Sequence, residues 1–315
     1  MPAQNTTEEE RRHLAESLSR PLPEIPPRYF YDDLGSALFE QITAVPEYYQ
    51  TRTELAILEA NAGEILALST PEHLVELGSG AGRKIRLLLE RLSGGTCTML
   101  DVNRTFLDDS IQTLSRDFPQ ISFRGVVGDL NRDLGRLGPG GRRLTLFFAG
   151  TIGNLNADER HHLLVSLAET MAPSDALLVG VDLVKDRARL EAAYNDAGGV
   201  TAAFNLNALN VLNRSFDADF QVGQFEHVAF YDPARAWIEM RVRARRAQRV
   251  RVGALGLTLD LPAGGEIRTE ISCKFTKASL TSAAAAAGLG LRRWFTDPDG
   301  LFALALLVPA VAEAA

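Results

Sequence analysis

Residues 73–84 read HLVELGSGAGRK, a short apolar run followed by glycines at every second position. The run is typical of a buried strand, and the glycines predict a tight turn whose backbone N–H groups can approach a ligand. A helix is expected directly afterwards, because apolar residues recur on one face at Ile85, Leu88, Leu89 and Leu92. Strand, glycine turn and helix together predict one unit of an α/β domain.

The alternation of apolar strands and amphipathic helices extends on both sides of this turn. Apolar strands are expected at 73–77, 96–102, 121–130, 143–152 and 176–183. Amphipathic helices are expected at 54–69, 85–94, 105–116 and 160–171. Strands separated by such helices predict βαβ units, and therefore a parallel sheet covered by helices on both faces. This region is expected to fold as a doubly wound α/β domain.

The pattern changes after residue 182. Residues 185–216 look helical with interruptions, whereas 236–252, 254–261 and 266–275 alternate as half-buried antiparallel strands do. We interpret this block as an insertion that builds a second, α+β domain together with the aromatic N-terminal segment. A helix and a strand hairpin over 279–308 then return to the first sheet. The expected boundaries are 1–53 for the N-terminal segment of the second domain, 54–186 for the first domain, 187–275 for the insertion and 276–315 for the return.

The composition excludes several classes of protein. A hydrophobic fraction of 46% with 23% charged residues is ordinary for a globular chain. A net charge of −7, from 33 basic and 40 acidic residues, disfavours a global attraction to nucleic acid or anionic lipid. Two cysteines exclude a disulfide scaffold, and the five histidines form no H-x-x-x-H pair, so no metal site is expected. The polar, acidic start is unlike a signal peptide, and no apolar run reaches 18 residues. We expect a cytoplasmic monomer without nucleic-acid or membrane partners.

The glycine turn is expected to bind a nucleotide, since ligands of open parallel sheets bind at the carboxyl ends of the strands. Asp101 follows Gly78 at a spacing that suits a carboxylate on ribose hydroxyls. A dinucleotide fingerprint has a glycine at its sixth position, where this chain has Arg83. The pattern E-x-G-x-G-x-G instead resembles the first motif of class I S-adenosylmethionine-dependent methyltransferases, and Asp129 fits the acid on the adenine side. A nicotinamide site and a purely structural turn are the alternatives.

Longer motifs in both domains carry a more specific resemblance. They are YFYDDLGSALFEQIT (29–43), PEYYQTRTE (46–54), VELGSG (75–80), GTIGNL (150–155), LLVGVDLVKD (177–186), AAYNDAGGVTAAFN (192–205), IEM (238–240) and TEISCKF (269–275). In this order they resemble the histidine Nα-methyltransferase family of ergothioneine biosynthesis, from about residue 28 to the end. The resemblance implies a Rossmann-like class I methyltransferase domain with a separate substrate-binding domain. It also implies conversion of L-histidine to its trimethylammonium betaine, hercynine, with three molecules of S-adenosylmethionine.

The resemblance further implies roles for individual residues. The cofactor would be contacted by Tyr31, Gly78, Gly80, Lys84, Asp101 and Asp129. The substrate carboxylate would be held by Asn154 and Tyr194, and the imidazole by Tyr48, Glu270 and Ser272, with Met240 packing nearby. The catalytic residues beside the reacting amine would be Tyr31, Phe39 and Tyr48. One departure is Ala149, where the family has a glycine whose carbonyl would face that amine.

The residues alone support the aromatic part of this assignment. Residues 28–54 hold four of the six tyrosines, and a core helix rarely needs so many hydroxyls that each require a partner. The simpler interpretation is a packing segment. The more specific one is a pocket wall, because aromatic rings stabilise a methylated ammonium by about 0.5–2 kcal/mol. Methyl transfer is an in-line displacement that depends on positioning, so no strong dedicated base is required.

Other residues have plainer interpretations. Without the resemblance, Glu270 and Ser272 would be assigned to a solvent-exposed strand face. Asn154 follows a glycine and would be assigned to a turn, where asparagine is common. The arginines at 241, 243 and 245 favour protection of an exposed edge strand over a nucleic-acid surface, since no aromatic residues interleave with them. Among functions, the main alternative is a methyltransferase of the same fold acting on another free amino acid or a histidine derivative. A cofactor-binding module without catalysis and a nicotinamide oxidoreductase are weaker alternatives.

Overall fold

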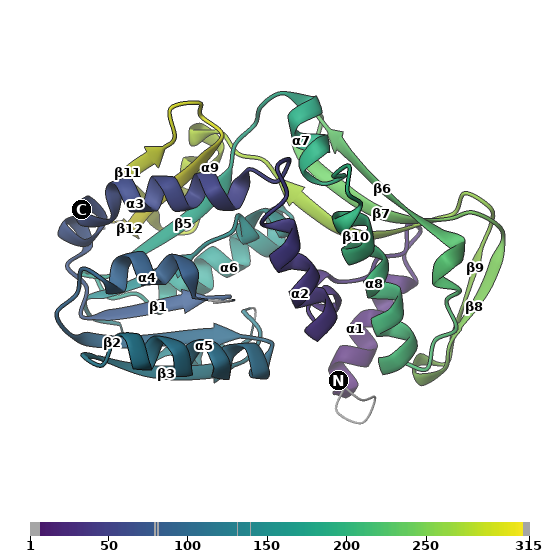
Figure 1. Ribbon diagram of the computed structural model, residues 1–315, viewed down its shortest axis with the longest axis horizontal. Helices are drawn as coiled ribbons and strands as arrows, with labels where there is room; N and C mark the ends of the chain where they lie inside the picture. The colour runs from purple at the N-terminus through teal and green to yellow at the C-terminus, as the bar shows by residue number, and fades with distance from the viewer. Residues whose placement is uncertain (1–6, 79, 81, 131, 139, 311–315) are drawn as a thin grey trace. The chain divides into compact units, whose positions relative to one another are not determined.

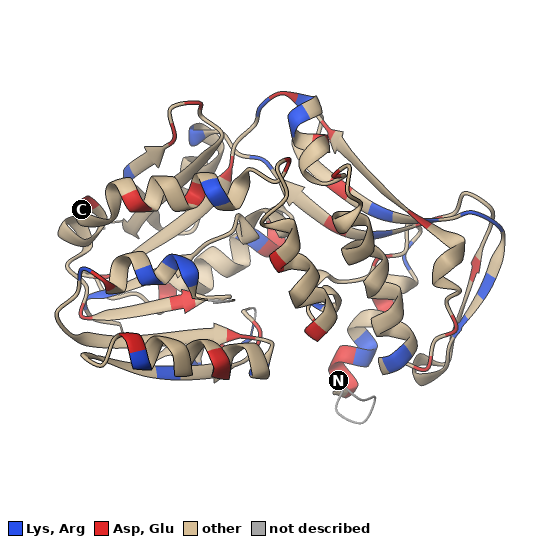
Figure 2. Ribbon diagram, viewed as in Figure 1, with Lys and Arg blue, Asp and Glu red and all other residues tan. Residues whose placement is uncertain are grey.

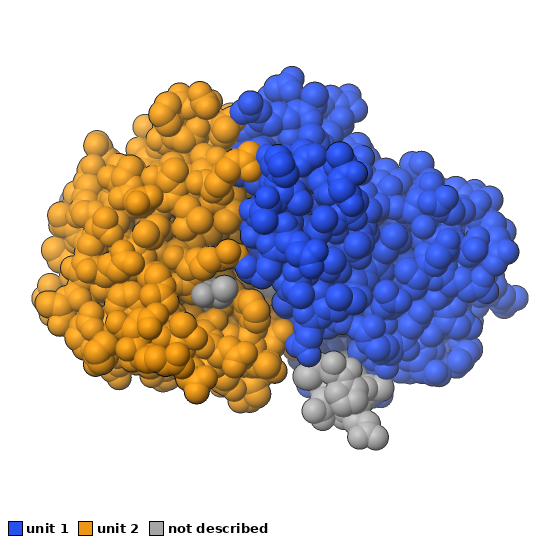
Figure 3. Space-filling view, viewed as in Figure 1, with its two compact units in different colours: residues 1–49, 185–272 blue, residues 50–184, 273–315 orange. Residues whose placement is uncertain are grey.

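The computed structural model describes residues 7–78, 80, 82–130, 132–138 and 140–310. The chain divides into two compact units (Figure 3). Unit 1 comprises Met1–Tyr49 and Lys185–Ser272, and unit 2 comprises Gln50–Val184 and Cys273–Ala315. The chain passes from one unit to the other after residues 49, 184 and 272. Part of the expected polar start, residues 1–6, lies outside the described residues, as do Ser79 and Ala81 of the glycine turn.

Unit 2 is built on a sheet that has seven strands within the described residues (Figure 1). Its order is β11-β12-β5-β4-β1-β2-β3. The strands are β1 His73–Leu77, β2 Gly95–Asp101, β3 Ile121–Val127, β4 Arg143–Phe147, β5 Ala176–Asp182, β11 Leu289–Thr296 and β12 Phe302–Pro309. The strands β1 to β5 pair in parallel, and β12 runs antiparallel to both β5 and β11. From β1 the sheet continues to β2 and β3 on one side and to β4 and β5 on the other, so the expected doubly wound α/β fold is confirmed.

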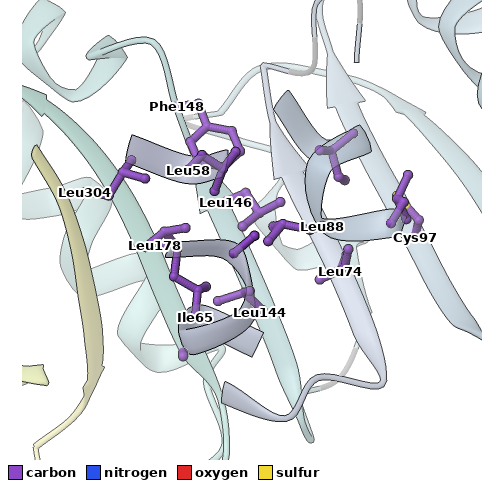
Figure 4. Close-up of a cluster of buried hydrophobic side chains, with 14 of the residues drawn as sticks. Leu58, Ile65, Leu74, Leu88, Cys97, Leu144, Leu146, Phe148, Leu178 and Leu304 are labelled. Carbon is purple, nitrogen blue, oxygen red and sulfur yellow. The ribbon is translucent and has the colours of Figure 1, made fainter. Parts of the chain in front are cut away.

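Helices cover both faces of this sheet. They are α3 Gln50–Ser69, α4 Arg83–Leu89, α5 Arg104–Asp117, α6 Ala157–Glu169 and α9 Lys277–Ala286, with the 3-10 turns η3 Leu134–Leu137 and η4 Thr151–Asn154. One apolar core lies under α3, α4 and α5, and it includes Leu58 of α3, Leu88 of α4 and Leu74 of β1 (Figure 4). The next strand residue, Val75, belongs to a second core with α6 and α9. This alternation is why strands buried on both faces are continuously apolar.

Unit 1 is an α+β unit. Its three-stranded sheet has the order β10-β7-β6, beside a two-stranded ribbon of β8 and β9, counted within the described residues. The strands are β6 Phe225–Asp232, β7 Trp237–Ala244, β8 Gln248–Val252, β9 Leu257–Leu261 and β10 Glu266–Cys273. The helices and turns are α1 Glu8–Leu18, η2 Pro27–Phe30, α2 Asp33–Ile42, α7 Arg187–Ala193, α8 Val200–Ser215, η5 Val222–Gln224 and η6 Gly253–Leu255. The N-terminal segment joins this sheet at β10, because Ile25 N–H donates to the Arg268 carbonyl at 2.8 Å.

The structure differs in detail from several expectations for the strands. The strand expected over 121–130 ends at Val127. The strand expected over 143–152 ends at Phe147, because Ala149 and Gly150 both have a left-handed backbone, with φ of 64° and 65°. The strand β7 lies in the centre of its sheet rather than at an edge. Its arginines belong to an ion-pair ladder instead, in which Arg241 and Arg243 lie 2.5 and 2.7 Å from Glu266. Both signs of charge occur along these strands (Figure 2).

The histidines of α6 and the cysteines differ in exposure. His161 and His162 are exposed on α6. Of the two cysteines, Cys97 is buried and Cys273 is partly buried. Within the described residues, no helix combines the length and the apolar character needed to cross a membrane.

Candidate active site

The glycine turn follows β1 at the point where the sheet reverses its winding. Gly78, Gly80 and Gly82 have φ of 70°, 49° and 65°, which side chains with a Cβ rarely adopt. A Cβ built at Gly78 or Gly80 would meet none of the described atoms within 4 Å. The turn therefore leaves room for a ligand to approach its backbone, as a nucleotide site requires.

Asp101 at the end of β2 is held beside this turn. Its Oδ2 accepts the Gly80 N–H at 3.1 Å, and its Oδ1 accepts the Asn103 N–H at 2.9 Å. Burial raises the pKa of this carboxyl, and the backbone N–H donors act against that rise. A carboxylate fixed by backbone donors at this strand end is well suited to accept hydrogen bonds from ribose hydroxyls.

Asp129 follows the neighbouring strand β3. Gly128 N–H donates to the Asp101 backbone carbonyl at 3.0 Å, which brings the ends of β2 and β3 together. The Asp129 N–H donates to Asp133 Oδ2 at 2.8 Å, so the turn that carries Asp129 is closed locally. The two acids expected to bind the cofactor thus stand at adjacent strand ends of one sheet edge.

Lys84 lies in the first turn of α4, directly after the glycine turn. Its Nζ is 2.5 Å from Glu54 Oε2, and the Glu54 side chain is fully buried. Glu54 also accepts the Ala149 N–H, at 3.1 Å on Oε1 and 2.9 Å on Oε2. A Cβ at Gly180 of β5 would overlap this carboxylate. Glu54 thus connects α3, α4, β5 and the turn after β4, and Lys84 reaches the sheet edge already paired.

The turn after β4 carries the residues of the T-I-G-N motif. Ala149 adopts the left-handed conformation that glycine favours, which explains why a glycine suits this position. The 3-10 turn η4 follows, and Asn154 is its last residue, partly exposed. Glu54 therefore holds the backbone of the same turn that presents Asn154.

Glu76 is a further buried acid in this unit. It lies in β1, two residues before Gly78, and its side chain is almost inaccessible. Burial raises the pKa of Glu76 to about 8; Asp101 and Glu54 add to the rise, and Lys84 opposes it. Glu76 is therefore largely protonated at neutral pH, which spares the unit a buried charge.

In unit 1 the expected aromatic residues form a connected cluster. The Tyr31 and Phe39 ring centroids are 5.9 Å apart, those of Phe39 and Tyr48 6.3 Å, and those of Tyr48 and Tyr194 6.4 Å, all edge to face. Phe204 of α8 contacts both Tyr31 and Phe39, with centroids 5.8 and 6.0 Å away. Tyr48 and Tyr194 are both 7% exposed. Rings packed edge to face in this way form an apolar wall, and the tyrosines add phenolic hydroxyls to it.

A polar group adjoins this wall. The Tyr194 hydroxyl and Ser272 Oγ form a hydrogen bond of 2.7 Å. Ser272 and Glu270 on β10 are 5% and 9% exposed, so the interpretation of this stretch as a solvated strand face is wrong. Met240 on the neighbouring strand β7 is also buried. Unit 1 thus contains a buried carboxylate, two hydroxyls and a thioether on adjoining elements.

The expected site residues therefore fall into two sets. One set lies in unit 2: Gly78, Gly80, Lys84, Asp101, Asp129 and Asn154. The other lies in unit 1: Tyr31, Phe39, Tyr48, Tyr194, Met240, Glu270 and Ser272. Within each unit, direct contacts connect Asp101 with Gly80, and Tyr194 with Tyr48 and Ser272.

Two residues that belong with these sets were missed from the sequence. Glu54 is predicted there only as the last residue of a motif and the first residue of a helix, although an acid between apolar positions of a core helix is a signal of a buried partner. Phe204 is predicted only as part of a motif. Its place in a helical segment gives no hint of the aromatic cluster, because the contacts join α8 to a segment far away in the chain.

Comparison with known proteins gives the family. Residues 10–309 match the model of a family described as histidine-specific methyltransferase, SAM-dependent. A histidine N-alpha-methyltransferase of Mycolicibacterium smegmatis is 45% identical over 312 residues, covering 98% of this chain and 97% of that protein. One of Mycobacterium tuberculosis is 46% identical over 300 residues, covering 94% of each chain. Ergothioneine biosynthesis protein 1 of Neurospora crassa is 30% identical over 252 residues, covering 73% of this chain and 29% of that protein. The chain belongs to the histidine-specific, SAM-dependent methyltransferase family.

Proposed function

We propose that this protein transfers three methyl groups from S-adenosylmethionine to the α-amino group of L-histidine, forming hercynine for ergothioneine biosynthesis. Family membership and two relatives similar over nearly their whole length support this proposal. The observation that carries the choice of substrate is the buried set of Glu270, Ser272 and Tyr194. A buried acceptor suits the N–H of an imidazole ring, and a site built around it rejects amino acids that lack such a group.

Unit 2 is proposed to bind the cofactor. Asp101 would hold the ribose hydroxyls, Asp129 the adenine side, and Lys84 the cofactor carboxylate, with the backbone of Gly78 and Gly80 alongside. The open space over both glycines and the carboxylate fixed at Asp101 fit such a ligand. S-adenosylmethionine supplies an electrophilic methyl group on a sulfonium.

Unit 1 is proposed to recognise the substrate. Tyr48, Glu270 and Ser272 would contact the imidazole, with Met240 packing against it, and Tyr194 would hold the carboxylate. A role for Asn154 at the carboxylate stays a prediction from the family resemblance. Tyr31, Phe39 and Tyr48 would stabilise the amine as it becomes a methylated ammonium, which aromatic rings favour by about 0.5–2 kcal/mol.

The chemistry of these residues is mainly positioning. An in-line displacement needs the amine lone pair directed at the methyl carbon, and orientation of this kind lowers the barrier without a covalent step. The amine must be neutral, and desolvation by the aromatic rings favours its neutral form. The ammonium formed by the first and by the second transfer must lose its proton to water, directly or through a tyrosine hydroxyl, before the next transfer. The third transfer forms a quaternary ammonium, which has no proton to lose.

The proposal is tested by incubating the purified protein with S-adenosylmethionine and an equimolar mixture of the common amino acids. Mass spectrometry then shows which amino acid gains one, two and three methyl groups. Histidine alone should be trimethylated. Methylation of another amino acid in preference to histidine would contradict the proposal.

Ala149 favours one alternative, a histidine derivative or another free amino acid as substrate. Its methyl group stands where a glycine would leave space beside the backbone. The same incubation, repeated with histidine derivatives, distinguishes the two possibilities by their relative kcat/KM. A cytoplasmic location and a monomeric state stay predictions, the second to be measured by sedimentation.

A further inference from the structure

His227 connects three elements of unit 1 through its imidazole ring. It lies in β6, where it pairs with Val242 of β7. Its Nε2 is 2.8 Å from the backbone carbonyl oxygen of Tyr194, and its Nδ1 is 2.8 Å from the side-chain nitrogen of Asn205. Neither the sequence motifs nor the proposed substrate contacts give this histidine a role.

The hydrogen bonds define the protonation state of the ring. A carbonyl oxygen only accepts, so Nε2 must carry the proton that it donates to Tyr194. Asn205 Nδ2 also donates to the Arg241 carbonyl at 2.9 Å, which orients the amide with its N–H groups toward His227. Nδ1 then accepts, and the ring is neutral. Burial lowers the pKa of His227, which favours the neutral ring. The Tyr194 carbonyl and the Asp196 carboxylate act in the opposite direction and raise this pKa, but burial has the larger effect.

The carbonyl that His227 binds lies at the end of a helix, where it has no hydrogen-bond donor within that helix. Helix α7 ends at Ala193, and Tyr194 is its C-cap. The last carbonyls of a helix have no partner within it and need one from elsewhere. A second bond joins the same two elements, since Tyr231 N–H of β6 donates to Glu191 Oε1 of α7 at 3.0 Å. The end of α7 is therefore held against β6 at both places.

From this fixed backbone, the Tyr194 side chain reaches the residues that are proposed to bind the substrate. Its hydroxyl bonds Ser272 at 2.7 Å, and its ring meets the Tyr48 ring. A tyrosine hydroxyl lies far from its own backbone, so a small rotation of the backbone moves it out of hydrogen-bonding range. We infer that His227 is a positioning residue, which sets the Tyr194 hydroxyl for the substrate carboxylate by binding the Tyr194 backbone. The inference rests on the proposed function, which makes Tyr194 a substrate contact.

Two conservative variants separate positioning from bulk packing. The amide nitrogen of His227→Gln overlies Nε2 and can still donate to Tyr194. The shorter side chain of His227→Asn places its amide oxygen at Nδ1 and does not reach the Tyr194 carbonyl. We expect His227→Asn to raise the KM for L-histidine about tenfold, the effect of one lost buried hydrogen bond, and His227→Gln to stay within about threefold of wild type. The Kd of S-adenosylhomocysteine should not change in either variant. Equal KM values for the two folded variants would overturn the inference.

A matched control is His73→Asn in unit 2. His73 is the first residue of β1, its Nε2 is 2.9 Å from Thr98 Oγ1, and burial lowers its pKa as well. The cofactor turn follows the other end of that strand. This variant should lose stability and keep the wild-type KM for L-histidine.

A spectroscopic measurement tests the hydrogen bonds without activity. In wild-type protein labelled with 15N at histidine, the His227 ring, assigned by its absence in His227→Gln, should show a protonated Nε2 and a bare Nδ1 at neutral pH. A charged ring or the opposite tautomer would overturn the inference, even if His227→Asn does not fold. If wild type leaves L-histidine unmethylated, the proposed function fails, and the two variants are then compared on the amino acid that is methylated.

Discussion

Glu54 and Lys84 form a 2.5 Å ion pair in which the carboxylate is fully buried and the ammonium nearly so. The pair is completed by the Ala149 N–H, which donates to both carboxylate oxygens. A buried carboxylate is tolerated only with such partners, so Glu54, Lys84 and the turn after β4 depend on one another. The pair links a residue proposed for the cofactor to the turn that carries a residue proposed for the substrate.

The first prediction follows from this pair. Glu54→Gln leaves the Lys84 ammonium without its counter-charge, and we expect the free energy of unfolding to fall by about 3–5 kcal/mol, as for other broken buried pairs. Glu64→Gln is the control on the same helix, because its pair with Arg293 at 2.8 Å is about half exposed. It should cost less than about 1 kcal/mol. Urea unfolding measures both, and equal losses would contradict the prediction.

The sequence predicted the sheet of unit 2 well, because strands buried on both faces are short apolar runs that helical segments separate. It also predicted Asp101 beside the glycine turn, where local chain spacing suffices. It could not predict Glu54, since the partners of this acid come from α4, β5 and the turn after β4. It placed Glu270 on a solvated face by the usual rule for charged residues, and only the resemblance indicated a buried site.

The second prediction concerns Ala149. A left-handed backbone costs an alanine roughly 1–2 kcal/mol, whereas glycine adopts it without strain. We expect Ala149→Gly to raise the free energy of unfolding by about 1 kcal/mol. Ala60→Gly, at an exposed position of helix α3, is the control and should lower it by about 1 kcal/mol. Destabilisation by Ala149→Gly in chemical denaturation would refute the assigned strain.

The third prediction is a pH dependence. Burial raises the pKa of Glu76 from its usual 4.5 to about 8, so between these values the folded chain keeps a proton that the unfolded chain has lost. Stability is therefore greatest below the unfolded pKa and declines as pH rises toward 8, by up to about 1.4 kcal/mol per pH unit.

Glu76→Gln is the variant that isolates this dependence, since an uncharged amide has no proton to lose. The free energy of unfolding is measured between about pH 5.5 and about pH 7.5, which lie between the two pKa values of Glu76. It should fall with rising pH more steeply in wild type than in the variant. Parallel curves for the two proteins would show that Glu76 is ionised in the folded state.

The last prediction separates the two proposed sets of residues. Glu270→Ala removes a buried acceptor of unit 1, so an imidazole N–H bound there would lose a charge-assisted hydrogen bond. Because such a bond contributes about 1.5–3 kcal/mol, kcat/KM for L-histidine should fall by about 10- to 150-fold. Glu270→Gln keeps one acceptor oxygen and should lose less. The affinity for S-adenosylhomocysteine, measured by calorimetry, should stay at the wild-type value, because Glu270 is not among the residues expected to contact the cofactor. An unchanged affinity for L-histidine in Glu270→Ala would remove the carboxylate from substrate recognition.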